Sequence, residues 1–183
     1  MKHAHRALLL PLLLTLLGGL AGCAGDASTN GRDSFNRTDV TFATEMVPHH
    51  RQSLQLVRMV EQRDVDPKLS GLAAQIRVTQ AVELESMTSW LKDWDVPVPS
   101  GDPSVGTGQS GTVSAADLAT LQGTSDADFE EQWLRLMIRQ HEDAIEIAKV
   151  ENAEGQYPYA VALANTVMVG HASQVRTMEL MLG

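Results

Sequence analysis

After residue 36, two histidines in the sequence each follow a methionine by four residues. The pairs are Met46 with His50 and Met137 with His141. Residues four apart lie on one face of an α-helix, so each thioether is expected beside an imidazole ring. Imidazole nitrogen and thioether sulfur form a donor set that suits copper, and Cu(I) in particular prefers soft sulfur ligands. These four residues are the predicted core of a copper site.

Further donors extend this set. His171 supplies a third imidazole, and His49 lies beside His50, although neighbouring residues on a helix diverge by about 100°. We predict His49 and His171 as additional metal ligands. We expect Glu45 to pair with His49, and Glu83 to hydrogen-bond a histidine of the preceding helix. The side chains expected to support the ligands are Glu45, Gln80, Glu83, Met87, Gln140, Gln174 and Met178.

The same pattern also has a simpler interpretation. Methionine at helical spacing is ordinary core packing, and buried histidines can be satisfied by hydrogen bonds alone. The chain would then be a ligand-free helical interaction or envelope-structure module. We assign three other methionines, Met59, Met168 and Met181, to packing.

The sequence carries no catalytic motif. Di-iron enzymes built on helical bundles use Glu-x-x-His, but the residues three before the histidines are Met46, Val47, Ile138 and Met168. No nucleophile motif, phosphate-binding loop or Cys/His zinc cluster is present either. We therefore expect sequestration rather than catalysis, and predict that the protein is not an enzyme.

Four long helices are expected to position these residues. Apolar side chains recur every three or four residues over 39–62, and Pro67 marks the first turn of a second helix. Two more helices are predicted over 126–153 and 158–182. β-Branched and aromatic residues are too few for a sheet, so the predicted fold class is all-α.

Pro48 falls inside the first predicted helix, just before the paired histidines. A mid-helix proline removes a backbone donor and clashes with the carbonyl four residues earlier, here that of Thr44. A kink or local opening is therefore expected at this point. Alternatively, Pro48 begins the helix and 39–47 forms a separate turn.

The two halves of the chain are related by an internal duplication. A shift of 91 residues carries the segment 46–50 onto 137–141, and the same shift pairs Gln80 with His171. Two helical hairpins joined by a long crossover are one way to build a four-helix bundle. The predicted units are hairpin one (about 37–94), a linker rich in Pro, Gly and Ser (95–125) with a short helix capped by Ser114, and hairpin two (about 126–182).

The N-terminal segment predicts export and a lipid anchor. Residues 1–22 combine a short basic start with an apolar run too short to span a bilayer comfortably, as in a secretory signal peptide. The Leu-Ala-Gly that precedes Cys23 resembles the bacterial lipobox, which implies cleavage before Cys23 and its lipidation. Alternatives are an uncleaved anchor or a free cysteine. We predict a flexible tether over 23–36 and a bundle domain over 37–183, anchored outside the cytoplasm to the cell membrane or outer membrane.

Charge and cysteine content exclude two classes of protein. The net charge is −9, and removing Lys2 and Arg6 with the signal peptide makes it −11. Nucleic acid is not expected as a partner, because phosphate binding needs a basic surface. The lone cysteine excludes an intramolecular disulfide framework. Expected partners are a metal ion and, through the lipid anchor, a membrane, so the sequence predicts an extracytoplasmic, membrane-tethered protein that captures copper.

Motifs along the chain resemble those of a bacterial family. They are Phe42, Met46-Val47-Pro48-His49-His50, Gln80-Ala81-Val82-Glu83, Met87, Trp90-Leu91, Phe129, Met137-Ile138-Arg139-Gln140-His141 and Ala144. Over about 36–182 the chain resembles the family numbered 305 among domains of unknown function. The resemblance implies a ferritin-like four-helix bundle, export and, as in some members, copper binding. The second half departs from the family pattern, because Gln140 replaces a usual histidine, and His171 and Gln174 replace a usual Gln and Glu.

Overall fold

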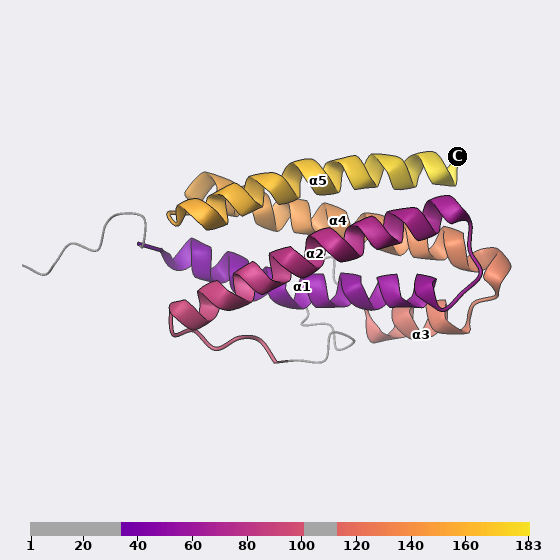
Figure 1. Cartoon of the computed structure of the whole chain (residues 1–183), viewed down its shortest axis with the longest axis horizontal. Coiled ribbons are helices and arrows are strands. Elements are labelled where there is room, and N and C mark those ends of the chain that lie inside the picture. Colours follow the sequence, from indigo (N-terminus) through magenta and orange to yellow (C-terminus); the bar gives the residue numbers. More distant parts are fainter. Residues whose placement is uncertain (1–33, 101–112) are drawn as a thin grey trace, which may run out of the picture.

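Five helices make up the part of the chain that the computed structural model describes, residues 34–100 and 113–183. They are α1 (Arg37–Glu61), α2 (Pro67–Asp93), α3 (Ala115–Gly123), α4 (Asp126–Glu154) and α5 (Pro158–Leu182). The four long helices lie lengthwise beside one another, with the short α3 at their edge (Figure 1). No strand occurs in these two ranges. The predicted all-α four-helix bundle is therefore confirmed.

Local sequence signals set the ends of these helices. The Asn36 side chain accepts hydrogen bonds from the backbone of Thr38 and Asp39, and the Asp39 carboxylate accepts one in return from the Asn36 N–H at 2.6 Å. Ser114 and Asp117 form the same reciprocal capping box at the start of α3. Such caps satisfy backbone donors that a helix leaves unpaired. The helices accordingly begin where the sequence predicted, to within two residues.

Several predictions fall outside the described ranges. The predicted signal peptide, Cys23 and most of the tether precede residue 34, and the middle of the crossover linker lies between the two ranges. None of the described helices has both the length and the apolar character needed to cross a bilayer. Within them, α1 continues through Pro48 without a break, so the alternative of a separate turn over 39–47 is wrong.

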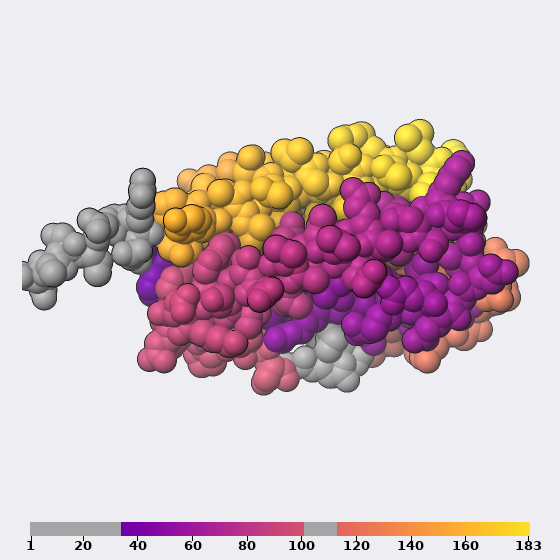
Figure 2. Space-filling model, in the orientation of Figure 1, coloured from indigo at the N-terminus to yellow at the C-terminus, as the bar shows by residue number. Residues whose placement is uncertain are grey.

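The arrangement of the helices reflects the duplication. Proline occupies the first turn of both α2 and α5, at Pro67 and Pro158, which are 91 residues apart. Each of these helices packs along the helix that precedes it, and the two hairpins join mainly through α1 and α4. By contrast, α2 and α5 contact each other little. Figure 2 shows the seam between α2 and α5 on one face of the molecule.

The apolar core is divided into two clusters along the bundle. In the first, the Trp133 Nε1–H donates a hydrogen bond to the Leu56 carbonyl at 2.8 Å, which fixes α4 against α1. The second lies toward the start of α1 and the end of α2. Representative members are Leu56, Ile76, Trp133, Met137 and Met178 in the first cluster, and Phe42, Met46, Met87, Ala148 and Val167 in the second.

Polar contacts hold both described ends of the crossover against α1. The Gln52 side chain donates to the Val113 carbonyl at 2.6 Å and accepts from the Val113 N–H at 2.8 Å. The Arg51 guanidinium donates to the Pro99 carbonyl. Arg51 and Gln52, which come directly after His49 and His50, therefore anchor the crossover to the middle of α1.

Two buried carboxyl groups close the end of the bundle where α1 begins. Asp39 accepts hydrogen bonds from the backbone N–H groups of Gln156 and Tyr157, at 3.0 and 2.8 Å. Glu151, near the end of α4, is 0 % exposed. Burial, a hydrogen bond to Asp39 and the charge of Asp39 raise the pKa of Glu151 to about 8. Glu151 therefore keeps its proton at neutral pH.

Candidate metal centre

A layer of polar side chains crosses the middle of the bundle between the two apolar clusters. Each long helix contributes two of them. This polar layer consists of His49 and His50 on α1, Gln80 and Glu83 on α2, Gln140 and His141 on α4, and His171 and Gln174 on α5. Glu83 is 12 % exposed, and each of the others is 8 % exposed or less. Burying so many polar groups costs free energy unless each finds a hydrogen-bond partner or a ligand.

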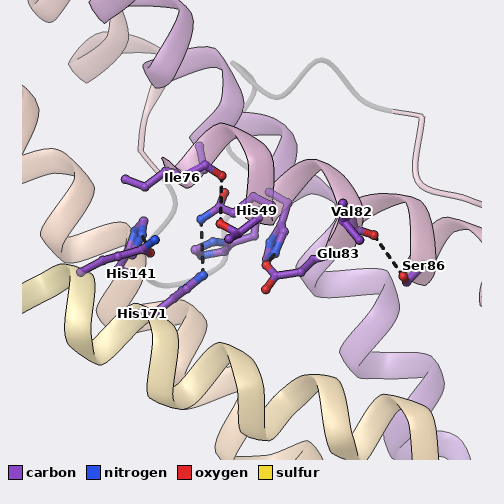
Figure 3. Close-up of polar contacts among 12 residues, drawn as sticks. His49, Ile76, Val82, Glu83, Ser86, His141 and His171 are labelled. Carbon is purple, nitrogen blue, oxygen red and sulfur yellow. Dashed lines mark hydrogen bonds and ion pairs between the residues drawn. The ribbon is translucent and has the colours of Figure 1, made fainter. Parts of the chain in front are cut away.

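Three imidazole rings converge in the polar layer from three helices. The centroid of the His171 ring lies 4.3 Å from that of His141 and 5.9 Å from that of His50. The Glu83 carboxylate joins them, with Oε2 2.8 Å from His50 Nε2. Figure 3 shows the side chains of Glu83, His141 and His171 extending into the space between the helices. The sequence predicted that Glu83 would meet a histidine of the preceding helix, and it does.

The separations within this group suit a shared metal ion. His50, Glu83 and His171 each place one ligand atom within 4.8 Å of the others. Two donors that are each about 2.1 Å from one ion lie no more than about 4.2 Å apart. The three ligand atoms would have to approach one another by no more than about 0.6 Å to come within the reach of one ion.

Hydrogen bonds account for only part of the imidazole nitrogens. Gln174 Oε1 accepts a hydrogen bond from His141 Nε2 at 2.9 Å, and Gln80 Nε2 lies 3.4 Å from His171 Nε2. The Nδ1 atoms of His50, His141 and His171 are buried and make no well-formed hydrogen bond within the described residues. A neutral His141 that donates through Nε2 carries its lone pair on Nδ1. The layer thus holds imidazole nitrogen that is free to bind an ion.

Burial keeps two of these histidines neutral. It lowers the pKa of His141 to about 3, although the hydrogen bond to Gln174 acts in the opposite direction. Burial also lowers the pKa of His171 well below 6.5, and the neighbouring His141 and His50 lower it further. Neutral imidazole is the form that binds metals, so these two side chains would not have to lose a proton to bind an ion at neutral pH.

His49 lies apart from the convergent group. Its Nε2 is 2.9 Å from Asp143 Oδ2, and its Nδ1 is 2.7 Å from Gln140 Nε2, so both ring nitrogens have partners. Burial lowers the pKa of His49, and the hydrogen bond that Asp143 accepts from this ring acts in the opposite direction. The expected pairing with Glu45 is therefore replaced by one with Asp143. Asp143 follows Gln140 by one helical turn, and that spacing is the signal in the sequence that could have identified it.

The methionines lie on either side of the polar layer. Met46 and Met87 belong to the second apolar cluster, whereas Met137 and Met178 belong to the first, and all four are fully buried. The Met137 Sδ also accepts a hydrogen bond from Ser53 Oγ at 3.3 Å. The structure thus brings together the imidazoles of His50, His141 and His171 but distributes the thioethers between two apolar environments.

A groove connects the polar layer to the surface. It has a volume of about 280 Å³ and follows the seam between α2 and α5, where Glu83, His171 and Gln174 line it together with Thr79 and Gly170. A larger hollow of about 560 Å³ lies near the start of α2 and the end of α5, and no residue of the polar layer lines it. The seam therefore supplies a route by which an ion can reach the imidazoles.

Comparison with known proteins shows the family to which the chain belongs. A family model described as "Domain of unknown function (DUF305)" matches residues 39–182. The chain belongs to the DUF305 family. A DUF305 fragment from Deinococcus radiodurans is 28% identical, with a TM-score of 0.73, and the match covers 81% of this chain and 97% of that one. No protein of curated function matches the sequence.

Two further structures extend the comparison of DUF305 bundles. A DUF305 protein from Streptomyces coelicolor, which carries the description of a secreted protein, is 29% identical, with a TM-score of 0.70 over 80% of this chain and 90% of that one. CopM in its Cu(II)-bound form is 25% identical, with a TM-score of 0.70 over 79% of this chain and 95% of that one. CopM has also been solved in Cu(I)-bound and silver-bound forms.

The donor set of this DUF305 protein fits a transition metal. Imidazole nitrogen and carboxylate oxygen suit Cu(II) and Zn(II), whereas thioether sulfur favours Cu(I). The group of His50, Glu83 and His171 supplies the first kind of donor. The buried Nδ1 atoms, which lack good hydrogen bonds within the described residues, are the feature that a bound ion would satisfy.

Proposed function

We propose that this protein captures copper outside the cytoplasm and holds the ion in the polar layer of its bundle. The observation that carries the proposal is the convergence of His50, Glu83 and His171, whose ligand atoms lie within 4.8 Å of one another. His141 adds a neutral imidazole 4.3 Å from the ring of His171. The copper-bound forms of CopM, which has a similar fold, support the choice of metal.

The donors that bind the copper ion determine which oxidation state the protein prefers. The nitrogen and oxygen donors of the polar layer suit Cu(II). Met46 and Met137, which flank the layer, are the sulfur donors proposed for Cu(I). The protein would sequester the ion rather than use it in catalysis, because the donors are buried and no catalytic motif lies beside them in the sequence.

A lipid on Cys23 is proposed to tether the bundle to the cell membrane or outer membrane. The lipobox-like sequence before Cys23 supports this, and the description of the Streptomyces coelicolor relative as secreted agrees with a place outside the cytoplasm. Replacing Cys23 with Ala should move the protein from the membrane fraction to the soluble fraction of its host. Retention of Cys23→Ala in the membrane fraction would contradict lipid anchoring.

A ligand-free helical module is the second candidate. The specific observation in its favour is that His49, His50 and His141 each have a hydrogen-bond partner within the protein, in Asp143, Glu83 and Gln174. Under this function the polar layer only orients the helices, and copper should not bind tightly.

Metal titration separates these two functions. The full-length protein in detergent is titrated with Cu(I) under anaerobic reducing conditions, and with Cu(II) in air. We expect binding tighter than micromolar, and its loss in the double variant His50→Ala/His171→Ala. The matched control is His49→Gln, which alters a buried histidine whose nitrogens are both engaged elsewhere.

Two outcomes would overturn copper capture. One is binding weaker than micromolar for both oxidation states. The other is unchanged binding in the His50→Ala/His171→Ala variant when circular dichroism shows that it is folded.

For the role of sulfur, Met46→Leu/Met137→Leu should weaken Cu(I) binding by at least tenfold and leave Cu(II) binding unchanged.

A further inference from the structure

The polar layer lies across the axis that relates the two hairpins. A shift of 91 residues carries the pair His50 and Glu83 onto His141 and Gln174, and the contacts are equivalent, at 2.8 and 2.9 Å. The counterpart of a residue is the one 91 positions away in the other hairpin. When such a pair is in contact, both residues lie close to the approximate two-fold axis that relates the hairpins. Two pairs of counterparts do so, His49 with Gln140 at 2.7 Å and Gln80 with His171 at 3.4 Å.

A group of ligands on one side of this axis must have a counterpart on the other side. The counterpart of His50, Glu83 and His171 is His141, Gln174 and Gln80, in that order. All three residues of this second group are buried, with exposed fractions of 0 %, 8 % and 1 %. The second group also has a buried atom without a hydrogen bond within the described residues, Gln80 Oε1. The fold therefore provides a second group of buried polar side chains in the position that corresponds to the first.

The chemistry of the two groups differs. The first offers two imidazole nitrogens and one carboxylate, whereas the second offers one imidazole nitrogen and two neutral carboxamides. Copper and zinc prefer imidazole, thiolate or carboxylate to a neutral amide. A buried divalent ion also needs nearby negative charge to offset its loss of water, and among the six side chains of the two groups only Glu83 is a carboxylate.

We infer that the bundle contains a second, latent metal site at His141, Gln174 and Gln80, which the two glutamines keep empty. One chain therefore binds one Cu(II) ion, on the side of Glu83. The inference rests on the proposed function, because it assumes that the first group binds copper. It adds that two side chains alone, Gln80 and Gln174, set the number of ions.

The test counts Cu(II) ions bound by the full-length protein in detergent, by dialysis and metal analysis. The wild type should bind one ion per chain, and Gln80→His/Gln174→Glu should bind two. A matched control, Gln62→His/Gln156→Glu, makes the same two changes at exposed positions at opposite ends of the bundle and should still bind one. In the wild-type background, Glu83→Gln should bind none.

The outcomes distinguish this inference from the proposed function. One ion in both the wild type and the folded Gln80→His/Gln174→Glu variant overturns the inference and leaves copper capture standing. Two ions in the wild type overturn it as well, and none in the wild type overturns both. If the double variant does not fold, Gln174→Glu alone should bind a second ion more weakly, and a single ion in that variant overturns the inference.

Discussion

The buried carboxyl pair at the end of the bundle makes a quantitative prediction for Glu151→Gln. The pKa of Glu151 is raised from 4.5 to about 8, so the folded protein holds this proton more tightly than the unfolded chain. The contribution of Glu151 to wild-type stability is therefore greatest below pH 4.5 and is lost as the pH rises through 8. A glutamine in this place needs no proton and can still donate a hydrogen bond to Asp39.

The magnitude follows from the size of the shift. Each pH unit between 4.5 and 8 changes the free energy of unfolding by about 1.4 kcal/mol. At pH 7 the wild type has lost about 3 kcal/mol through Glu151, and at pH 8 about 4 kcal/mol. The free energy of unfolding of Glu151→Gln minus that of the wild type should therefore be about 3 kcal/mol larger at pH 7 than at pH 4.5.

Urea denaturation of the metal-free protein at pH 4.5, 7 and 8 measures this difference. The histidines titrate in both proteins, so their contribution cancels when the variant is compared with the wild type. Glu154→Gln, at an exposed position three residues later, is the control and should show no such trend. A stability gap between Glu151→Gln and the wild type that stays constant from pH 4.5 to 8 would refute the reasoning.

Three further predictions concern the polar layer and the core. Because burial lowers the pKa of His141 to about 3, metal-free protein should lose stability as the pH falls from 6.5, and His141→Gln should reduce that slope by about 1 kcal/mol per pH unit in urea denaturation. Glu83→Ala should weaken Cu(II) binding at least tenfold by calorimetry, whereas an unchanged affinity would remove Glu83 from the site. Trp133→Phe leaves the buried Leu56 carbonyl without its side-chain donor and should cost about 1–3 kcal/mol in thermal unfolding, with no effect on copper binding.

The sequence was a reliable guide to the helices because their signals are local. Capping residues such as Asn36 and Ser114, and the prolines of α2 and α5, act within one turn of chain. The duplication added long-range information, because it places His50 and His141 at the same level of two equivalent hairpins. The polar layer could therefore be anticipated in outline.

Contacts between helices were harder to predict, because they depend on how each helix is rotated about its axis. Spacing alone favoured Glu45 as the partner of His49, but the partner is Asp143 on α4. Likewise, a spacing of four puts Met46 and His50 on one face without fixing whether the thioether turns toward the polar layer or the apolar cluster. In the structure, Met46 packs in the apolar cluster of Phe42.

The seam between α2 and α5 bears on how fast the bundle can exchange an ion. Each of these helices is held along its length by its own hairpin partner, and few contacts join them to each other. Opening the seam therefore breaks little of the core and leaves both hairpins folded. Exchange of the proposed copper ion should then be limited by local fluctuations, on microsecond to millisecond timescales, and not by global unfolding. Such a bundle can keep an ion out of water at equilibrium and still surrender it promptly to a tighter binder.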